Sequence, residues 1–187
     1  MSEHESQPTF EISEMTVDDI DPATQMRYQS WKDTYQNDAL GITLEWINKR
    51  FETQLSDEYR GKRIERFTLG KQNSTFNAWV AKDTNGEVIG STTPYIDEEG
   101  IQHVGSLYVD KKWHGTGVGS QLMQKVINWL DPAKPIELGV ITYNERARAF
   151  YRKWEFEDVP GSETLYDNIM PEIKMIRPAT NQPKEQA

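Results

Sequence analysis

A glycine-rich segment in the middle of the chain is the first candidate for binding chemistry. It follows the apolar run Leu107-Tyr108-Val109 and reads His114-Gly115-Thr116-Gly117-Val118-Gly119-Ser120. A strand that leads through glycines into a helix brings several backbone N–H groups to one point, where they bind phosphate well. The segment lacks the Lys-Ser or Lys-Thr of a P-loop, and Ser120 breaks the dinucleotide pattern. A turn that only caps a helix is the simpler interpretation.

A second candidate lies about 25 residues further along, in the segment Asn-Glu-Arg-Ala-Arg-Ala-Phe-Tyr-Arg-Lys-Trp-Glu-Phe that spans residues 144–156. In a helix, one face of this segment would carry Asn144, Ala147, Arg148 and Tyr151. Tyr151 is then either a half-buried packing residue, as most helical tyrosines are, or a functional group held at a site.

Composition excludes several other classes of function. The 187 residues carry 21 basic and 30 acidic side chains, a net charge of −9, which disfavours binding to nucleic acid or to an anionic membrane. The chain has no cysteine, and its three histidines have no zinc-binding spacing, so we expect no metal site. No Gly-x-Ser-x-Gly motif supports serine hydrolase chemistry.

The elements that must position these segments follow from hydrophobic spacing. A short strand begins at Phe10, and helices follow over residues 22–35 and 43–55. Residues 57–75 fit either a helical extension or a loop. The rest of the chain predicts strands at 76–80, 88–96, 103–109, 136–143 and 169–176, and helices at 118–130 and 144–153. This order is typical of an α+β fold around a mixed, mostly antiparallel sheet.

The chain is expected to form one domain. We expect flexible termini at residues 1–9 and 179–187, with a single domain from 10 to 178. The first 21 residues include seven acidic residues and no Lys or Arg, unlike the start of a signal peptide. No apolar run approaches the length of a membrane span, so we expect a cytoplasmic protein.

Both candidate segments together resemble the GCN5-related N-acetyltransferase (GNAT) superfamily, and the resemblance covers nearly all of residues 10–178. The acetyl-coenzyme A signature of that family, Gln/Arg-x-x-Gly-x-Gly/Ala, matches residues 114–119, except that His114 replaces Arg or Gln. A later family pattern is matched by Asn144, Ala147, Phe150, Tyr151, Lys153 and Phe156. The N-terminal part looks like a broad bacterial branch that acts on small molecules or proteins.

The resemblance implies where acetyl-coenzyme A would bind. In the family the sheet opens between two strands, here those at 103–109 and 136–143, and the pantetheine arm lies in the gap. The implied cofactor-binding residues are Leu107, Tyr108, Val109, His114, Gly115, Thr116, Gly117, Val118, Gly119, Ser120 and Asn144. An N–H near Val109 would polarise the thioester carbonyl, and the pyrophosphate would lie on the glycine-rich loop.

The resemblance also implies that Tyr151 is the acid that protonates the departing thiolate. Many relatives take their base from a Glu on the strand before the loop, but no carboxylate stands there in this chain. His103 is the candidate on that strand, predicted to share a face with Gly105 and Leu107, and imidazole titrates near neutral pH. An exposed histidine without a catalytic role, or a proton path through water, fits the same residues.

The sequence therefore predicts an acetyl-coenzyme A dependent N-acetyltransferase that acts on a primary amine through a ternary complex. The amine could belong to a small molecule or to a protein, and the family resemblance implies a homodimer as one option. A catalytically weak relative that binds acyl-coenzyme A as a sensor or interaction module is the alternative. Trp31, Tyr35 and Trp46 are candidates for lining an acceptor pocket, although aromatic residues at helical spacing are more often core.

Overall fold

The computed structural model describes residues 9–180 of the chain. Its elements run in the order β1 (Phe10–Glu14), α1 (Ile20–Thr34), α2 (Leu44–Gln54), α3 (Asp57–Gln72), β2 (Trp79–Asp83), β3 (Val88–Ile96), β4 (Gln102–Val109), α4 (Val118–Trp129), β5 (Ile136–Ile141), α5 (Glu145–Arg152), β6 (Glu157–Asp158), β7 (Thr164–Tyr166) and β8 (Met170–Arg177). Three short 3₁₀ turns, at Val17–Asp19, Asp38–Leu40 and Lys111–Trp113, join them.

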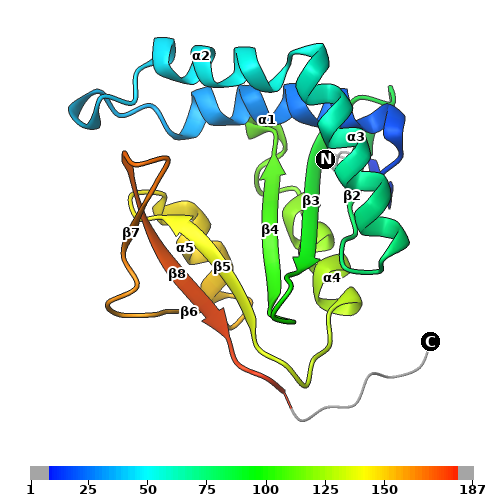
Figure 1. Cartoon of the computed structure of the whole chain (residues 1–187), viewed down its shortest axis with the longest axis vertical. Helices are drawn as coiled ribbons and strands as arrows, with labels where there is room; N and C mark the ends of the chain where they lie inside the picture. Colours follow the sequence, from blue (N-terminus) through cyan, green and yellow to red (C-terminus); the bar gives the residue numbers. More distant parts are fainter. Residues whose placement is uncertain (1–8, 181–187) are drawn as a thin grey trace, which may run out of the picture.

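One mixed sheet organises the molecule, in the strand order β1-β2-β3-β4-β5-β8-β6, with β7 paired to β8 (Figure 1). All neighbours are antiparallel except β4 and β5, which are parallel. These two strands pair only at Gln102 with Ile136 and at His103 with Glu137. Beyond that point they diverge, so the sheet opens into a V between β4 and β5 (Figure 1).

Helices cover both faces of the sheet. On one face α4 buries Val118, Leu122, Met123 and Val126 against the strands, because these residues repeat with helical spacing. Tyr151 places α5 in the same cluster as β5 and β8. The other face is covered by α1, α2 and α3, through clusters centred on Trp31 and Phe51 and on Ile20 and Ala23.

A bulge in β4 changes which side chains share a face. Thr92 pairs with Leu107 and Pro94 pairs with Val104, so β4 carries one extra residue between Val104 and Leu107. An extra residue reverses the alternation of side chains beyond it. Leu107 therefore packs toward α4, whereas His103 stacks on Tyr95 on the α1–α3 face. The expectation that His103 and Leu107 share a face is wrong.

Most expected elements are confirmed, including the α+β class, the antiparallel strands before the glycine-rich loop and the opening between the two strands. Residues 57–75, left open between helix and loop, form α3 up to Gln72. The strand expected at 136–143 ends at Ile141, and the short strands β6 and β7 carried no recognisable pattern. Residues 1–8 and 181–187, part of the predicted flexible termini, lie outside the described residues. No helix within residues 9–180 is long and apolar enough to span a bilayer.

The packing of α4 makes a stability prediction. Leu122 is fully buried between α4 and the strands β2 and β3, where it packs with Ala81, Ile89 and Val118. Leu122→Ala removes buried methyl groups and leaves a cavity, so we expect the free energy of unfolding to fall by about 3 kcal/mol. Urea denaturation followed by circular dichroism would measure this loss. A loss below about 1 kcal/mol would mean that α4 does not pack as described.

Candidate functional site

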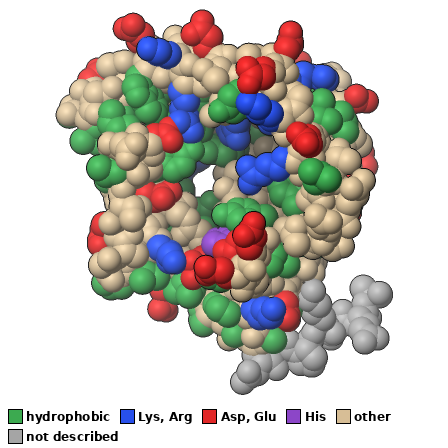
Figure 2. Space-filling view, viewed as in Figure 1, with side chains coloured by type: hydrophobic (Ala, Val, Ile, Leu, Met, Phe, Trp, Pro, Cys, Tyr) green, Lys and Arg blue, Asp and Glu red, His purple; other side chains and the backbone are tan. Residues whose placement is uncertain are grey.

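The opening between β4 and β5 forms the main cleft among the described residues, with a volume of about 820 Å³. Its walls come from α1, β4, the glycine-rich loop, the start of α4, β5, α5 and β8. It reaches both faces of the sheet, and Figure 2 shows an opening through the molecule near the centre of the view. Two molecules could therefore meet in the gap from opposite faces.

The glycine-rich loop borders the cleft and leaves its backbone exposed. Gly115 and Gly117 adopt positive φ angles of 82° and 97°, which L side chains rarely adopt, and a Cβ on either would meet no atom within 4 Å. Gly117 is the N-cap of α4, so the N–H groups of Val118, Gly119 and Ser120 lack intrahelical acceptors. Open space, free N–H groups and the positive end of α4 suit a phosphate group.

The edge of β4 that faces the gap is the second component. Val104 to Val109 all line the cleft, and β5 does not pair with any of them. Every buried backbone donor and acceptor needs a partner. This edge can therefore bind an extended, amide-bearing chain in the place of a missing strand.

Tyr151 is held on α5 at the bottom of the cleft. Asn144 caps this helix, with its Oδ1 accepting from the N–H of Ala147 at 3.1 Å. The Tyr151 ring makes edge contacts with Phe150 and Phe156 and is 8% exposed. Burial raises the pKa of the Tyr151 phenol well above its ordinary value, so the phenol stays protonated at neutral pH.

Two further tyrosines, Tyr108 and Tyr35, line the cleft near Tyr151. Trp31 Nε1 donates to the hydroxyl of Tyr108 at 3.0 Å. Burial raises the pKa of Tyr35, and the nearby hydroxyls of Tyr108 and Tyr151 add to this effect. Trp31 and Tyr35 line the cleft, whereas Trp46 lies behind Trp31, stacked on it at 6.5 Å. The α1 side of the cleft is therefore lined by aromatic side chains.

His103 is not brought to this cleft. Its Nε2 lies 2.9 Å from Oδ2 of Asp97, and its ring stacks on Tyr95 at 4.6 Å. It is also one of the two β4 residues that still pair with β5, at the closed end of the V. His103 is not among the residues that line the gap, and its ring is paired with Asp97, so it is not placed to act as a base there.

His114 lies beside a cation that the sequence analysis missed. Arg146, two residues after Asn144, lies against the His114 ring, with Nη2 2.8 Å from Nε2 and Nη1 in contact with Nδ1. Both side chains line the cleft next to the glycine-rich loop. Burial lowers the pKa of Arg146, but a guanidinium remains charged. α5 thus supplies the positive charge that the loop itself lacks at His114.

The position of Arg146 makes a binding prediction. Arg146→Ala removes a charge-assisted contact to any phosphate on the loop, so we expect about tenfold weaker binding of acetyl-coenzyme A, with a weaker salt dependence. Calorimetric titration at two salt concentrations would measure both. Arg152→Ala is the matched control, because Arg152 lies on the same helix but pairs with Asp158 at 2.6 Å. Equal losses in the two variants would contradict the assignment.

Glu172 is the second residue that the sequence analysis missed. It lies on β8, which passes beside β5, and its side chain lines the cleft. Burial raises the pKa of its carboxyl group. The sequence around it, Met-Pro-Glu-Ile, is ordinary for a strand, and only the pairing of β8 with β5 brings the carboxylate to the gap. Within residues 9–180 no three acidic or histidine side chains gather in a way that would hold a metal ion.

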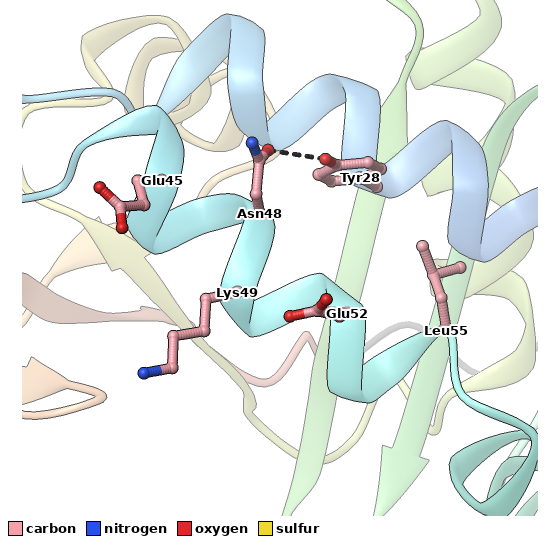
Figure 3. A pocket seen from close by; sticks show the side chains of 6 residues that line it. All are labelled: Tyr28, Glu45, Asn48, Lys49, Glu52 and Leu55. Carbon is pink, nitrogen blue, oxygen red and sulfur yellow. Dashed lines mark hydrogen bonds between the residues drawn. The ribbon is translucent and has the colours of Figure 1, made fainter.

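A second depression, of about 480 Å³, lies on the outside of α1 and α2 (Figure 3). Tyr28 donates to Asn48 Oδ1 at 2.6 Å there. Glu45 and Lys49 extend from α2 without contacting each other (Figure 3). This depression shares no lining residue with the gap.

The comparisons with known proteins agree with this geometry. Residues 40–156 match the profile of the Acetyltransferase (GNAT) family. A search of curated protein sequences gives no match.

Similar folds occur among solved structures. PaiA N-acetyltransferase from Thermoplasma acidophilum in complex with coenzyme A is 19% identical with a TM-score of 0.69, covering 91% of this chain and 99% of that one. A GNAT-family acetyltransferase from Staphylococcus aureus Mu50 is 18% identical with a TM-score of 0.64, covering 92% and 100%. Ribosomal-protein-S5-alanine acetyltransferase from Vibrio fischeri is 15% identical with a TM-score of 0.65, covering 93% and 96%. At these identities the likeness concerns the fold.

Proposed function

Because the chain belongs to the acetyltransferase (GNAT) family, we propose that it transfers the acetyl group of acetyl-coenzyme A to a primary amine, by direct attack in a ternary complex. The observation that carries the proposal is the unpaired edge of β4, which runs along the cleft directly into a glycine-rich loop with open backbone. An extended amide chain that ends in phosphates fits this combination.

The residues present fit acetyl-coenzyme A. The pyrophosphate would lie against the guanidinium of Arg146 and the N–H groups of the loop, those of Gly115, Gly117, Val118, Gly119 and Ser120. The loop leaves room for it, because Gly115 and Gly117 have no side chains there. The edge at Leu107, Tyr108 and Val109, which β5 leaves unpaired, would bind the pantetheine arm through backbone hydrogen bonds. The carbonyl oxygen of Val109 already has a partner, Nε2 of His114 at 3.0 Å. Asn144 contributes indirectly, because it caps the helix that carries Arg146 and Tyr151.

The catalytic proposal assigns two roles to this chain. A backbone N–H near Val109 would donate to the thioester carbonyl oxygen, where negative charge develops during attack by the amine. Tyr151 would give its proton to the thiolate as the C–S bond breaks. Burial, which keeps this phenol protonated, supports that role.

A thiol-release assay tests the function. The protein is mixed with acetyl-coenzyme A and, in turn, 1,5-diaminopentane, glucosamine and the dipeptide Ala-Ala, and free coenzyme A thiol and acetylated product are measured. These amines represent a polyamine, an amino sugar and a protein N-terminus. We expect thiol and acetylated amine in equal amounts with at least one of them. Thiol without acetylated amine would indicate hydrolysis and would contradict the proposal.

A further inference from the structure

Two glycines border the gap on the α1–α3 face of the sheet, one on each side of the V. A Cβ on Gly105 of β4 would lie 2.5 Å from the backbone oxygen of Thr93 and 2.8 Å from the ring of Tyr95, both of which belong to β3. A Cβ on Gly139 of β5 would lie 2.5 Å from Oε1 of Glu172, which belongs to β8. The missing side chain of Gly105 therefore lets Tyr95 of β3 lie over β4. In the same way, the missing side chain of Gly139 lets Glu172 of β8 lie over β5.

The Glu172 carboxylate lies over β5 without a partner. No described residue makes a hydrogen bond or an ion pair with it, although it is partly buried in the wall of the cleft. A buried carboxylate without a partner costs free energy when it ionises, and burial accordingly raises the pKa of Glu172. Such a group in a cleft is a candidate for function.

Two other carboxylates on this face, and the arginine nearest to β7, are already paired. Glu137 of β5 binds Lys174 of β8 at 2.6 Å, and Asp97 binds His103 at 2.9 Å. On β7 the Tyr166 hydroxyl accepts from Arg50 of α2 at 2.7 Å, and Arg50 also pairs with Asp167.

Across the gap, Tyr95 is close enough for these carboxylates to affect its pKa. Burial raises its pKa, and Asp97, Glu137 and Glu172 add to the effect, while Arg66 of α3 opposes it. Of these three carboxylates, Glu172 is the one without an ion-pair partner among the described residues, and it lines the cleft.

We propose that the acceptor binds on the α1–α3 face as a protonated alkylamine against Glu172, and that this carboxylate removes the proton before attack. The proposal rests on the acetyltransferase function proposed above. It places the base on β8, across the gap from β4, and it gives a reason for Gly139, since any larger residue there would collide with the carboxylate.

The proposed step balances in atoms and charge. The ammonium gives one proton to Glu172, and the free amine nitrogen forms a bond to the thioester carbonyl carbon. The C–S bond then breaks and the thiolate takes a proton from Tyr151. In passing from ammonium to amide the nitrogen gives up two protons. The first passes from Glu172 to solvent. The second leaves the nitrogen as the C–S bond breaks, and it replaces the proton that Tyr151 gives to the thiolate.

The test is the pH dependence of acetyl transfer in Glu172→Gln, measured by thiol release with 1,5-diaminopentane, or with glucosamine or Ala-Ala if that is the better acceptor. At pH 7 we expect kcat/KM to fall about 10²-fold. Without a base the variant depends on free amine from solution, so its rate should rise about tenfold per pH unit up to the amine pKa. The wild-type rate should depend less steeply on pH.

Two variants control the experiment. Glu137→Gln removes a carboxylate from the same face, but one that pairs with Lys174, and it should retain the wild-type pH profile. Gly139→Ala should displace the Glu172 carboxylate and reproduce part of the Glu172→Gln loss.

Thermal unfolding checks that the Glu172→Gln variant is folded. The pKa of Glu172 is raised in the folded state, so ionisation lowers stability as pH rises through that pKa. Glu172→Gln should therefore unfold at the same temperature as the wild type, or a higher one, at pH 7 and above.

The outcomes separate the two proposals. A steep profile in Glu172→Gln, with normal profiles in the wild type and Glu137→Gln, supports Glu172 as the base. A wild type that acetylates an amine, with an unchanged profile in Glu172→Gln, would overturn the base assignment alone. A wild type that acetylates none of the three amines while binding acetyl-coenzyme A would count against the proposed function, and the base assignment would fall with it.

Discussion

Tyr151→Phe is expected to lower kcat for acetyl transfer by about 10³-fold, while the affinity for acetyl-coenzyme A changes less than about threefold. The hydroxyl is the only group removed, and a positioned acid contributes roughly 10²–10⁴-fold. The ring remains in its contacts with Phe150 and Phe156, so the fold should not change. Steady-state kinetics and calorimetric titration measure the two quantities separately.

The control for Tyr151 is Tyr35→Phe, which removes a neighbouring hydroxyl from the same group of tyrosines. We expect a smaller loss of kcat from Tyr35→Phe than from Tyr151→Phe. Slow turnover that Tyr151→Phe leaves unchanged would contradict the role of Tyr151 and would favour a catalytically weak acyl-coenzyme A binding module.

Gly117→Val is expected to weaken acetyl-coenzyme A binding at least 10³-fold. The residue has a φ angle of 97° at the start of α4, a conformation that a β-branched residue avoids. Its side chain would also enter the open space in which we place the pyrophosphate. Loss of several backbone hydrogen bonds to a charged group is large enough for this effect.

Gly100→Val is the matched control for Gly117→Val. Gly100 has a φ angle of 81° and equally open surroundings, but it lies in the turn between β3 and β4, outside the cleft lining. Both variants should lose similar stability in thermal unfolding, and only Gly117→Val should lose binding. Retained binding in Gly117→Val would contradict the placement of the phosphates.

The fold and the residues that border the glycine-rich side of the cleft could be predicted because their signals are local. Leu107-Tyr108-Val109, the glycines and the apolar repeat of α4 are contiguous, and each residue type follows from the conformation it must adopt. Asn144 and Tyr151 are likewise separated by two turns of one helix.

The residues that we propose for the acceptor side could not be predicted, because they meet only through strand pairing and a bulge. Glu172 lies 33 positions after Gly139 in the sequence, yet its carboxylate covers that glycine once β8 pairs with β5. The extra residue in β4 turned His103 away from the face of Leu107, and strict alternation does not anticipate a bulge. Arg146 was overlooked because its partner His114 is on a different element.

Calorimetric titration of the purified protein with acetyl-coenzyme A tests the central claim most directly, since every role assigned to the cleft depends on this ligand. We predict micromolar affinity with one molecule bound per chain. Addition of an accepted amine to the complex should then release coenzyme A thiol. Absence of binding at millimolar acetyl-coenzyme A would contradict the account.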